Sequence, residues 1–301
     1  MDFHKAYLNE LTGLMDWDSP DMNPEVDSLN LCNRPTSYKS ILGYTTSSRF
    51  FETIFKNKSV VAIILPVDLV DEFRKGCNQC NRMIAIIPSH QPENDFYDLH
   101  NKLYKETNFY RKATNKPVIG CNCNIHPSAV IENNVIIGNN VTIGPNSVIR
   151  EGSVIDDDVT IGCLSVIGSE GFQAIKGYDK MVRHVGGTHI SKGVYVGDNS
   201  TIGNALFEGN TEIGEYCKIS NHVQISHNCK IGRRSIITAC CMLMGSAVLK
   251  ENVWLAPNSI ILNGVEVGDS SFVGTLTYVN KDIDAQDRVV GIPCRSIKNN
   301  V

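Results

Sequence analysis

An aliphatic residue returns at every sixth position through much of this chain, and that period constrains the fold more than any other feature. Helices and strands repeat their side-chain directions about every 3.6 and 2 residues, so neither element alone gives a period of six. The period is typical of short strands joined by tight turns, with one side chain per strand pointing into a narrow interior. We therefore predict a hexapeptide β-solenoid. The aliphatic positions form a first run, a short group after a break, and a second long run: Ile125, Ile131, Ile137, Ile143, Ile149, Ile155, Ile161 and Ile167; Ile190, Val196 and Ile202; and Ile213 through Val279 in steps of six.

Two other positions of the repeat support this prediction. The second residue is often glycine, as in Gly138 and Gly144, and we expect it to allow the turn. The fifth residue is small or β-branched, as in Val135 and Ser147, which suits a crowded interior. Three hexapeptides would complete one coil, so residues eighteen apart should stack at a spacing of about 4.8 Å.

Composition limits the class of protein. The chain has 301 residues, of which 42% are hydrophobic, so about two domains with a sizeable core are expected. A formal net charge of −4 without basic runs argues against nucleic acid as a main partner. The opening MDFHKAYLNELTGLMDW lacks an apolar signal region, and no uninterrupted apolar window is long enough to span a bilayer. We expect a cytoplasmic protein with no transmembrane segment.

The eleven cysteines are irregularly spaced and odd in number, which favours reduced thiols over a disulfide framework. The pairs Cys77/Cys80 and Cys121/Cys123 have a spacing that zinc sites use. No second Cys or His pair follows at the distance such sites need, so we expect no metal and no permanently bound cofactor.

Hydrophobic patterning divides the chain into segments. Strand patterns at 59–67 and 82–89 alternate with helix patterns at 68–76 and 94–106, which indicates a small α/β domain after an irregular or helical lead-in. The predicted segments are an N-terminal α/β domain at 1–121, a solenoid domain at 122–283 with a long insertion at 168–189, and a C-terminal tail at 284–301.

His227 is the strongest candidate for chemistry. Ile225 begins a repeat, so the side chain two positions later should point outward. An imidazole near neutrality can take a proton from an attacking amine or hydroxyl group. The alternative is a surface histidine at a subunit contact.

The segment NHVQISHNCKIG (221–232), preceded by VIGSEGF in the insertion, resembles the region around the catalytic histidine of the UDP-3-O-acylglucosamine N-acyltransferases of the lipid A pathway. The resemblance implies a left-handed parallel β-helix of the hexapeptide acyltransferase superfamily, mainly β in class, with a small N-terminal α/β domain. It places the catalytic base at His227 and implies substrate-binding roles for four neighbours: Phe172, Asn221, Gln224 and Asn228.

The resemblance extends to LGYTTSSRF (42–50), which is similar to a family segment that holds the uracil ring between aromatic side chains. It places Tyr44 and Phe50 at the aromatic positions and Ser47 at a polar one. Stacking of a base on an aromatic ring contributes about 1 to 3 kcal/mol. The alternative is that both rings belong to the core of the small domain.

The chain also departs from this family. Ser220 stands where the family has an acidic residue, and Asp198 and Glu208 are alternative partners for His227. The family's second histidine, associated with the acylated part of the lipid A precursor, falls at Gly264. The ending GIPCRSIK instead resembles that of acetyl-CoA-dependent sugar acetyltransferases, which favours an acyl-CoA donor. The expected donor-binding residues are Gly245, which would leave space for a thioester, and three cations: Lys281, Arg288 and Arg295.

The predicted function is an N-acyltransferase that moves an acyl group from acyl-CoA to the amine of a nucleotide-linked amino sugar, for cell-surface polysaccharide or lipopolysaccharide synthesis. The resemblance implies a homotrimer with active sites between adjacent chains. Two alternatives remain open. One is the acyl-carrier-protein-dependent UDP-3-O-acylglucosamine N-acyltransferase itself, and the other is a non-catalytic scaffold that binds sugar nucleotides.

Overall fold

A computed structural model describes residues 5–32, 36–110, 115–175, 179–207 and 209–297, and it divides into two compact units. The first unit is Met1–Lys112 together with Phe172–Arg183, and the second is Ala113–Gly171 together with His184–Val301. The middle of the predicted insertion thus belongs to the first unit. The second unit begins near residue 113, earlier than the predicted boundary at 122, because Val118 and Ile119 already pair with the next coil.

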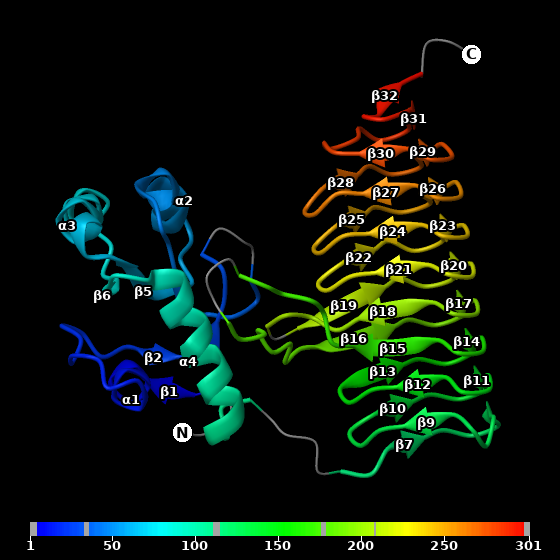
Figure 1. Cartoon of the computed structure of the whole chain (residues 1–301), viewed down its shortest axis with the longest axis horizontal. Helices are drawn as coiled ribbons and strands as arrows, with labels where there is room; N and C mark the ends of the chain where they lie inside the picture. Colours follow the sequence, from blue (N-terminus) through cyan, green and yellow to red (C-terminus); the bar gives the residue numbers. More distant parts are fainter. Residues whose placement is uncertain (1–4, 33–35, 111–114, 176–178, 208, 298–301) are drawn as a thin grey trace. The chain divides into compact units, whose positions relative to one another are not determined.

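The first unit contains a parallel sheet with helices (Figure 1). The predicted strands at 59–67 and 82–89 and helices at 68–76 and 94–106 are confirmed within a few residues. None of the helices in the described residues is long and apolar enough to cross a membrane. The sheet has the order β3 (Ser28–Leu29), β4 (Ile41–Tyr44), β5 (Val60–Pro66) and β6 (Ala85–Ser89); a separate pair is β1 (Ala6–Tyr7) with β2 (Glu25–Val26); the helices are α1 (Leu8–Leu14), α2 (Phe51–Lys56), α3 (Val70–Gln79) and α4 (Pro92–Glu106), with short 3₁₀ helices η1 (Ser48–Phe50) and η2 (Val67–Leu69).

Helix α4 begins and ends with residues that suit a helix. Pro92 occupies the first turn, where its missing N–H costs nothing, and Glu93 and Asp95 place negative charge at the same end. Lys105 lies in the last turn, where a cation is favourable. The helix packs against β5 and β4 and carries buried Phe96 on its inner face.

Helix α4 also fixes the part of the insertion that belongs to the first unit. The Asn101 amide accepts a hydrogen bond from the Arg183 N–H (3.0 Å) and donates one to the Met181 carbonyl (3.1 Å). His100 lies beside it, with Nε2 2.8 Å from the Arg183 carbonyl and Nδ1 2.8 Å from the Tyr110 hydroxyl. Because a carbonyl only accepts, Nε2 carries the proton and the Tyr110 hydroxyl donates to Nδ1.

We expect the stability of the first unit to fall as the pH is lowered from about 6.5 to about 4. Burial lowers the pKa of His100 to about 4, against about 6.5 in an unfolded chain. Below pH 6.5 the unfolded state takes up a proton that the folded state excludes. The free energy of unfolding is therefore about 3 kcal/mol lower at pH 4 than at neutral pH. Denaturant titrations at pH 7.0, 5.5 and 4.0 measure this loss. The His100→Gln variant keeps a donor for Arg183 but does not titrate, so a loss of equal size in that variant would rule out His100 as its source.

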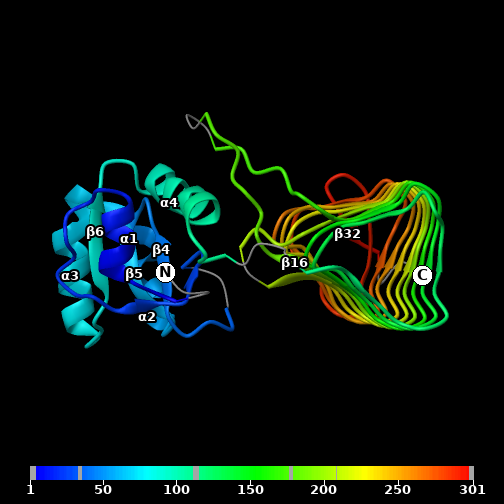
Figure 2. The same ribbon diagram turned by 90° about the horizontal axis from the view of Figure 1, so that it is seen from below.

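The second unit is a left-handed parallel β-helix of three-stranded coils, seen end-on in Figure 2. Each coil contributes one strand to each of three parallel sheets. The first sheet contains β7 (Val118–Ile119), β10 (Ile136–Ile137), β13 (Ser153–Ile155), β16 (Gly187–Ile190), β19 (Asn210–Ile213), β22 (Lys230–Ile231), β25 (Val248–Leu249) and β28 (Glu266–Val267). The second contains β8 (Asn124–Ile125), β11 (Thr142–Ile143), β14 (Thr160–Ile161), β17 (Tyr195–Val196), β20 (Lys218–Ile219), β23 (Ile236–Ile237), β26 (Trp254–Leu255), β29 (Phe272–Val273), β31 (Arg288–Val290) and the antiparallel β32 (Arg295–Ser296). The third contains β9 (Val130–Ile131), β12 (Val148–Ile149), β15 (Val166–Ser169), β18 (Thr201–Gly203), β21 (Gln224–Ile225), β24 (Met242–Leu243), β27 (Ile260–Ile261) and β30 (Tyr278–Val279).

The predicted register is confirmed. Residues eighteen apart pair within each sheet, as Ile143 does with Ile161, and the aliphatic residues of the repeat form one continuous buried core. The fold class, mainly β with a small N-terminal α/β domain, is confirmed as well. The predicted tail at 284–301 is partly wrong, because β31 continues the second sheet and Val289 continues the core. Val289 pairs with Val273, which lies sixteen residues earlier instead of eighteen. Because of this shorter spacing, the six-residue period does not reveal the last coil.

The turns use different residues from those expected. Gly138 and Gly144, in the second position of the repeat, do not have a positive φ. A Cβ atom on Gly144 would lie 2.8 Å from the backbone of Gly162, so glycine is needed there for the close approach of the next coil. The left-handed backbone falls two residues later, at Asn140 (φ 58°) and Asn146 (φ 55°), and asparagine tolerates this conformation well.

Candidate active site

His227 lies on the corner that connects β21 to β22. Ile225 points into the core, whereas His227 is half-buried and lies outside the apolar cluster. The strand pairing stacks the corresponding residues of successive coils along this corner. We call this column the His227 ridge; it consists of Asn204, His227, Gly245, Asn263 and Lys281.

Asn228 fixes the tautomer of the His227 ring. The Oδ1 atom of Asn228 accepts a hydrogen bond from the Leu206 N–H (2.9 Å) and lies 3.1 Å from Nδ1 of His227. Because the Leu206 N–H can only donate, the atom that meets it must be the amide oxygen, which can only accept. Nδ1 of His227 therefore carries the proton, and Nε2 is the basic nitrogen. The Asn228 N–H is itself held by the Thr211 hydroxyl (2.8 Å).

Gly245 makes room for the His227 ring. A Cβ atom on Gly245 would lie 2.5 Å from Cε1 and Nε2 of His227 and 2.9 Å from Oδ1 of Asn263. The imidazole and the Asn263 amide therefore occupy the space that the sequence suggested for a thioester. That reason for assigning Gly245 to the donor is wrong, because the absence of a side chain at Gly245 makes room for the His227 ring.

A second histidine, His184, contacts His227 and was missed by the sequence analysis. Its ring is buried, and the two ring centroids are 5.3 Å apart with the planes at 64°. It comes from the end of the insertion, where the six-residue period is interrupted. Spacing therefore gave no signal for its position beside His227.

Other residues assigned near His227 have different surroundings. Asn221 lies on the corner before β21, where its Oδ1 accepts a hydrogen bond from the Asp198 N–H (2.8 Å). Asp198 in turn accepts a hydrogen bond from the Cys163 N–H (2.7 Å). These contacts of Asp198 lie on the corner before β21, whereas His227 lies on the corner after it. Glu208 lies outside the described residues. Gln224 is exposed on the outer face of β21. Asn228, expected to bind substrate, instead places its Oδ1 3.1 Å from Nδ1 of His227.

The expected donor-binding cations do not gather in one place. Lys281 lies on the His227 ridge, three coils from His227, which corresponds to about 14 Å along the β-helix. Arg288 lies on the second sheet with its guanidinium 5.4 Å from the Phe272 ring. Arg295 is exposed on β32 of that same sheet. Only Lys281 of these three shares a corner with His227.

The residues assigned to the nucleotide lie in the first unit. The Tyr44 hydroxyl donates to Glu93 (2.8 Å), and its ring is 4.9 Å from that of Phe96. Burial, together with Tyr97 and Glu93, raises the pKa of Tyr44 well above its usual value, so the hydroxyl stays protonated.

Ser47 and Phe50 lie around the short helix η1. The Ser47 hydroxyl accepts a hydrogen bond from the Arg49 N–H (3.4 Å). The Arg49 guanidinium lies 4.5 Å from the Phe50 ring, which also packs against the core. Phe172 is 80% exposed. The half-buried Tyr44 and Phe50 therefore both contribute to packing in the first unit.

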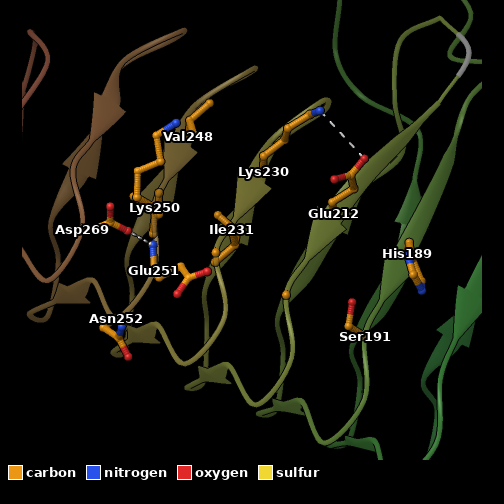
Figure 3. A pocket seen from close by; sticks show the side chains of 13 residues that line it. His189, Ser191, Glu212, Lys230, Ile231, Val248, Lys250, Glu251, Asn252 and Asp269 are labelled. Carbon is orange, nitrogen blue, oxygen red and sulfur yellow. Dashed lines mark hydrogen bonds and ion pairs between the residues drawn. The ribbon is translucent and has the colours of Figure 1, made fainter. Parts of the chain in front are cut away.

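A hollow elsewhere on the β-helix does not include His227 (Figure 3). It lies along the first sheet, and its charged side chains largely pair with each other or with neighbours. Lys230 is 3.9 Å from Glu212, and Lys250 is 3.1 Å from Glu266. His189 in this hollow is 3.1 Å from Asp156.

The cysteines are all free thiols. Burial raises the pKa of Cys77 to about 11 and that of Cys229 to about 12, so both stay protonated near neutrality. Within the part of the chain that the structure describes, no three His, Cys, Asp or Glu side chains are grouped so that they could hold a metal ion.

Two family models match this chain. The model described as bacterial transferase hexapeptide (six repeats) matches residues 116–151, where the first coils of the β-helix lie. The model described as the GMPPB C-terminal domain matches residues 201–300, which include His227.

The chain is also similar to curated enzymes named UDP-3-O-acylglucosamine N-acyltransferase. It is 35% identical to that of Wolinella succinogenes over 132 residues, which cover 43% of this chain and 41% of the relative. It is 42% identical to that of Helicobacter pylori over 92 residues, which cover 30% and 27%. The chain thus matches less than half the length of these relatives. A solved UDP-N-acetylglucosamine acyltransferase from Campylobacter jejuni is 23% identical with a TM-score of 0.46, covering 62% of this chain and 73% of that one.

Proposed function

We propose that the chain transfers an acyl group from a thioester to the amine of a UDP-linked 3-O-acylglucosamine, in the cytoplasm, for lipid A synthesis. The observation that carries this proposal is the His227 ring, whose Nδ1–H meets Asn228 so that Nε2 is the basic nitrogen. The names of the relatives favour this reading, which was the alternative in the sequence analysis, over transfer from acyl-CoA to another amino sugar.

His227 acts as general base and then as general acid. The sugar amine attacks the thioester carbonyl carbon, and Nε2 of His227 takes the proton that the nitrogen loses. The tetrahedral oxyanion is stabilised by backbone N–H groups, for which Gly245 is the candidate. When the intermediate collapses, the C–S bond breaks and the imidazolium returns the proton to the leaving thiolate. Asn228 stabilises the imidazolium because its oxygen accepts from Nδ1 in both states.

Several further residues bind the two substrates in this proposal. Tyr44 and Phe50 hold the uracil ring with Ser47 beside it, and each stacked face contributes about 1 to 3 kcal/mol. Phe172 in the insertion and Gln224 on β21 contact the acceptor. Lys281 on the His227 ridge contacts the donor.

In this proposal the active enzyme is a homotrimer. Large apolar side chains are exposed on the outer faces of the β-helix, where a neighbouring copy would bury them: Tyr195 (44% exposed), Ile236 (36%), Met242 (38%) and Trp254 (50%). Exposed apolar ladders of this kind are typical of surfaces that bind another protein.

The donor distinguishes this proposal from the acyl-CoA reading. Purified protein is incubated with UDP-3-O-acylglucosamine and either a hydroxyacyl-carrier protein or the same acyl chain on coenzyme A, and released thiol is measured. We expect transfer from the carrier protein at a rate at least about tenfold above that from coenzyme A, and none to an acceptor whose amine is already acetylated. Faster transfer from coenzyme A than from the carrier protein would favour acyl-CoA as the donor. The absence of thiol release from both donors would leave the non-catalytic scaffold as the better account.

A further inference from the structure

We propose that His184 is a positioning residue whose ring holds the His227 imidazole in the orientation set by Asn228. The kinetic part of this inference rests on the proposed function, whereas the structural part concerns only the orientation of His227. His184 lies at the end of the insertion and enters the second unit with its side chain buried.

The His184 ring lies close to two neighbours. One is His227, at 5.3 Å between ring centroids and with the planes at 64°. The ring also lies close to Gly171, where a Cβ atom would be 2.4 Å from Nε2 of His184. No larger residue fits at position 171 without displacing the ring, so Gly171 and His227 both restrict the position of His184. Edge-to-face contacts at this distance are favourable and directional.

The backbone around His184 is held by the same turn that holds Asn228. The His184 carbonyl accepts a hydrogen bond from the buried Asn204 amide (3.2 Å). The next residue, Val185, donates its N–H to the Leu206 carbonyl (3.1 Å). The N–H of that same Leu206 donates to Oδ1 of Asn228 (2.9 Å), which meets His227. Leu206 therefore holds both Val185, which follows His184, and Asn228, which follows His227.

This arrangement limits how the His227 ring can turn. Gly245 accommodates one edge, Asn228 accepts from Nδ1, and His184 covers part of the ring. Loss of the His184 ring would leave a cavity into which the imidazole can rotate, and Nδ1 would then leave Asn228. A displacement of about 1 Å at a reacting group can reduce the rate about 100-fold.

Three substitutions separate ring packing from other roles. His184→Ala removes the ring, His184→Leu fills volume without a flat face, and His184→Phe restores the ring without its nitrogens. We expect kcat to fall about 10- to 100-fold in the Ala and Leu variants, with KM for both substrates within about 3-fold, and the Phe variant to recover to within about 3-fold. His222→Asn is the matched control, because His222 is exposed on a different corner and asparagine tolerates its φ of 57°.

A second measurement does not depend on activity. Long-range ¹H–¹⁵N spectra of histidine-labelled protein report the tautomer of His227, assigned by its loss in His227→Gln. We expect a single Nδ1–H form in the wild type and in His184→Phe, and a mixture in the Ala and Leu variants. An unchanged tautomer in both of those variants, or a Phe variant as impaired as Ala, would overturn the role of the ring. If the wild type transfers nothing from any donor, the proposed function fails while these spectra still decide the role of His184.

Discussion

The His227→Ala variant should lose about 10² to 10⁴ in kcat while KM for the acceptor changes little. General base catalysis by a positioned imidazole contributes about this factor, and the rest of the rate comes from holding an already reactive thioester close to the amine. The side chain is half-buried and outside the apolar core, so its removal should leave folding almost unchanged. Thiol release at saturating donor and a thermal unfolding curve together measure both effects.

The control for this variant is His222→Asn, which replaces an exposed histidine on the corner before β21. It should keep the wild-type rate within about 2-fold. Wild-type turnover by His227→Ala, in protein with an unchanged unfolding midpoint, would remove His227 from the mechanism.

The Gly245→Ala variant should also lose most of its activity, by about 10- to 1,000-fold in kcat. The added Cβ would lie 2.5 Å from Nε2 of His227, closer than such contacts occur, so we expect the ring to shift from its present position beside the Asn228 oxygen. Because the site depends on geometry, a shift of this size removes much of the benefit of a positioned base. The rate is measured as for His227→Ala, and the crystal structure of the variant shows the ring position.

Gly13→Ala is a suitable comparison, since Gly13 lies in α1 and a Cβ atom there meets nothing within 4 Å. We expect its activity to remain within about 2-fold of the wild type. A Gly245→Ala enzyme that retains full activity would mean that the His227 ring does not need its present position.

The interior of the β-helix could be predicted from the sequence because a single side chain per strand must be apolar. Ile143 and Ile161 pair eighteen residues apart, as the period requires. The corners were harder to predict. Gly144 reads as a turn residue but serves close approach between coils, and the left-handed position falls on Asn146. Both residue types favour turns, so composition alone does not distinguish their roles.

The site was only partly predictable for a similar reason. His227 stands within the regular repeat, so its outward direction follows from Ile225. The partner Asn228 was visible but was assigned to substrate, because a hydrogen bond between neighbouring side chains depends on the corner geometry. His184 follows an insertion that breaks the period, and its contact with His227 required the folded chain. In the first unit, β3 and β4 were missed because strands of two and four residues carry too little pattern.

The most direct test of the account is a crystal structure of the protein with a UDP-linked 3-O-acylglucosamine acceptor bound in the absence of donor. The account predicts the glucosamine nitrogen within about 3.2 Å of Nε2 of His227, or joined to it through one water, with Nδ1 still facing Asn228. An acceptor bound with its amine elsewhere, for example in the hollow along the first sheet in Figure 3, would contradict it.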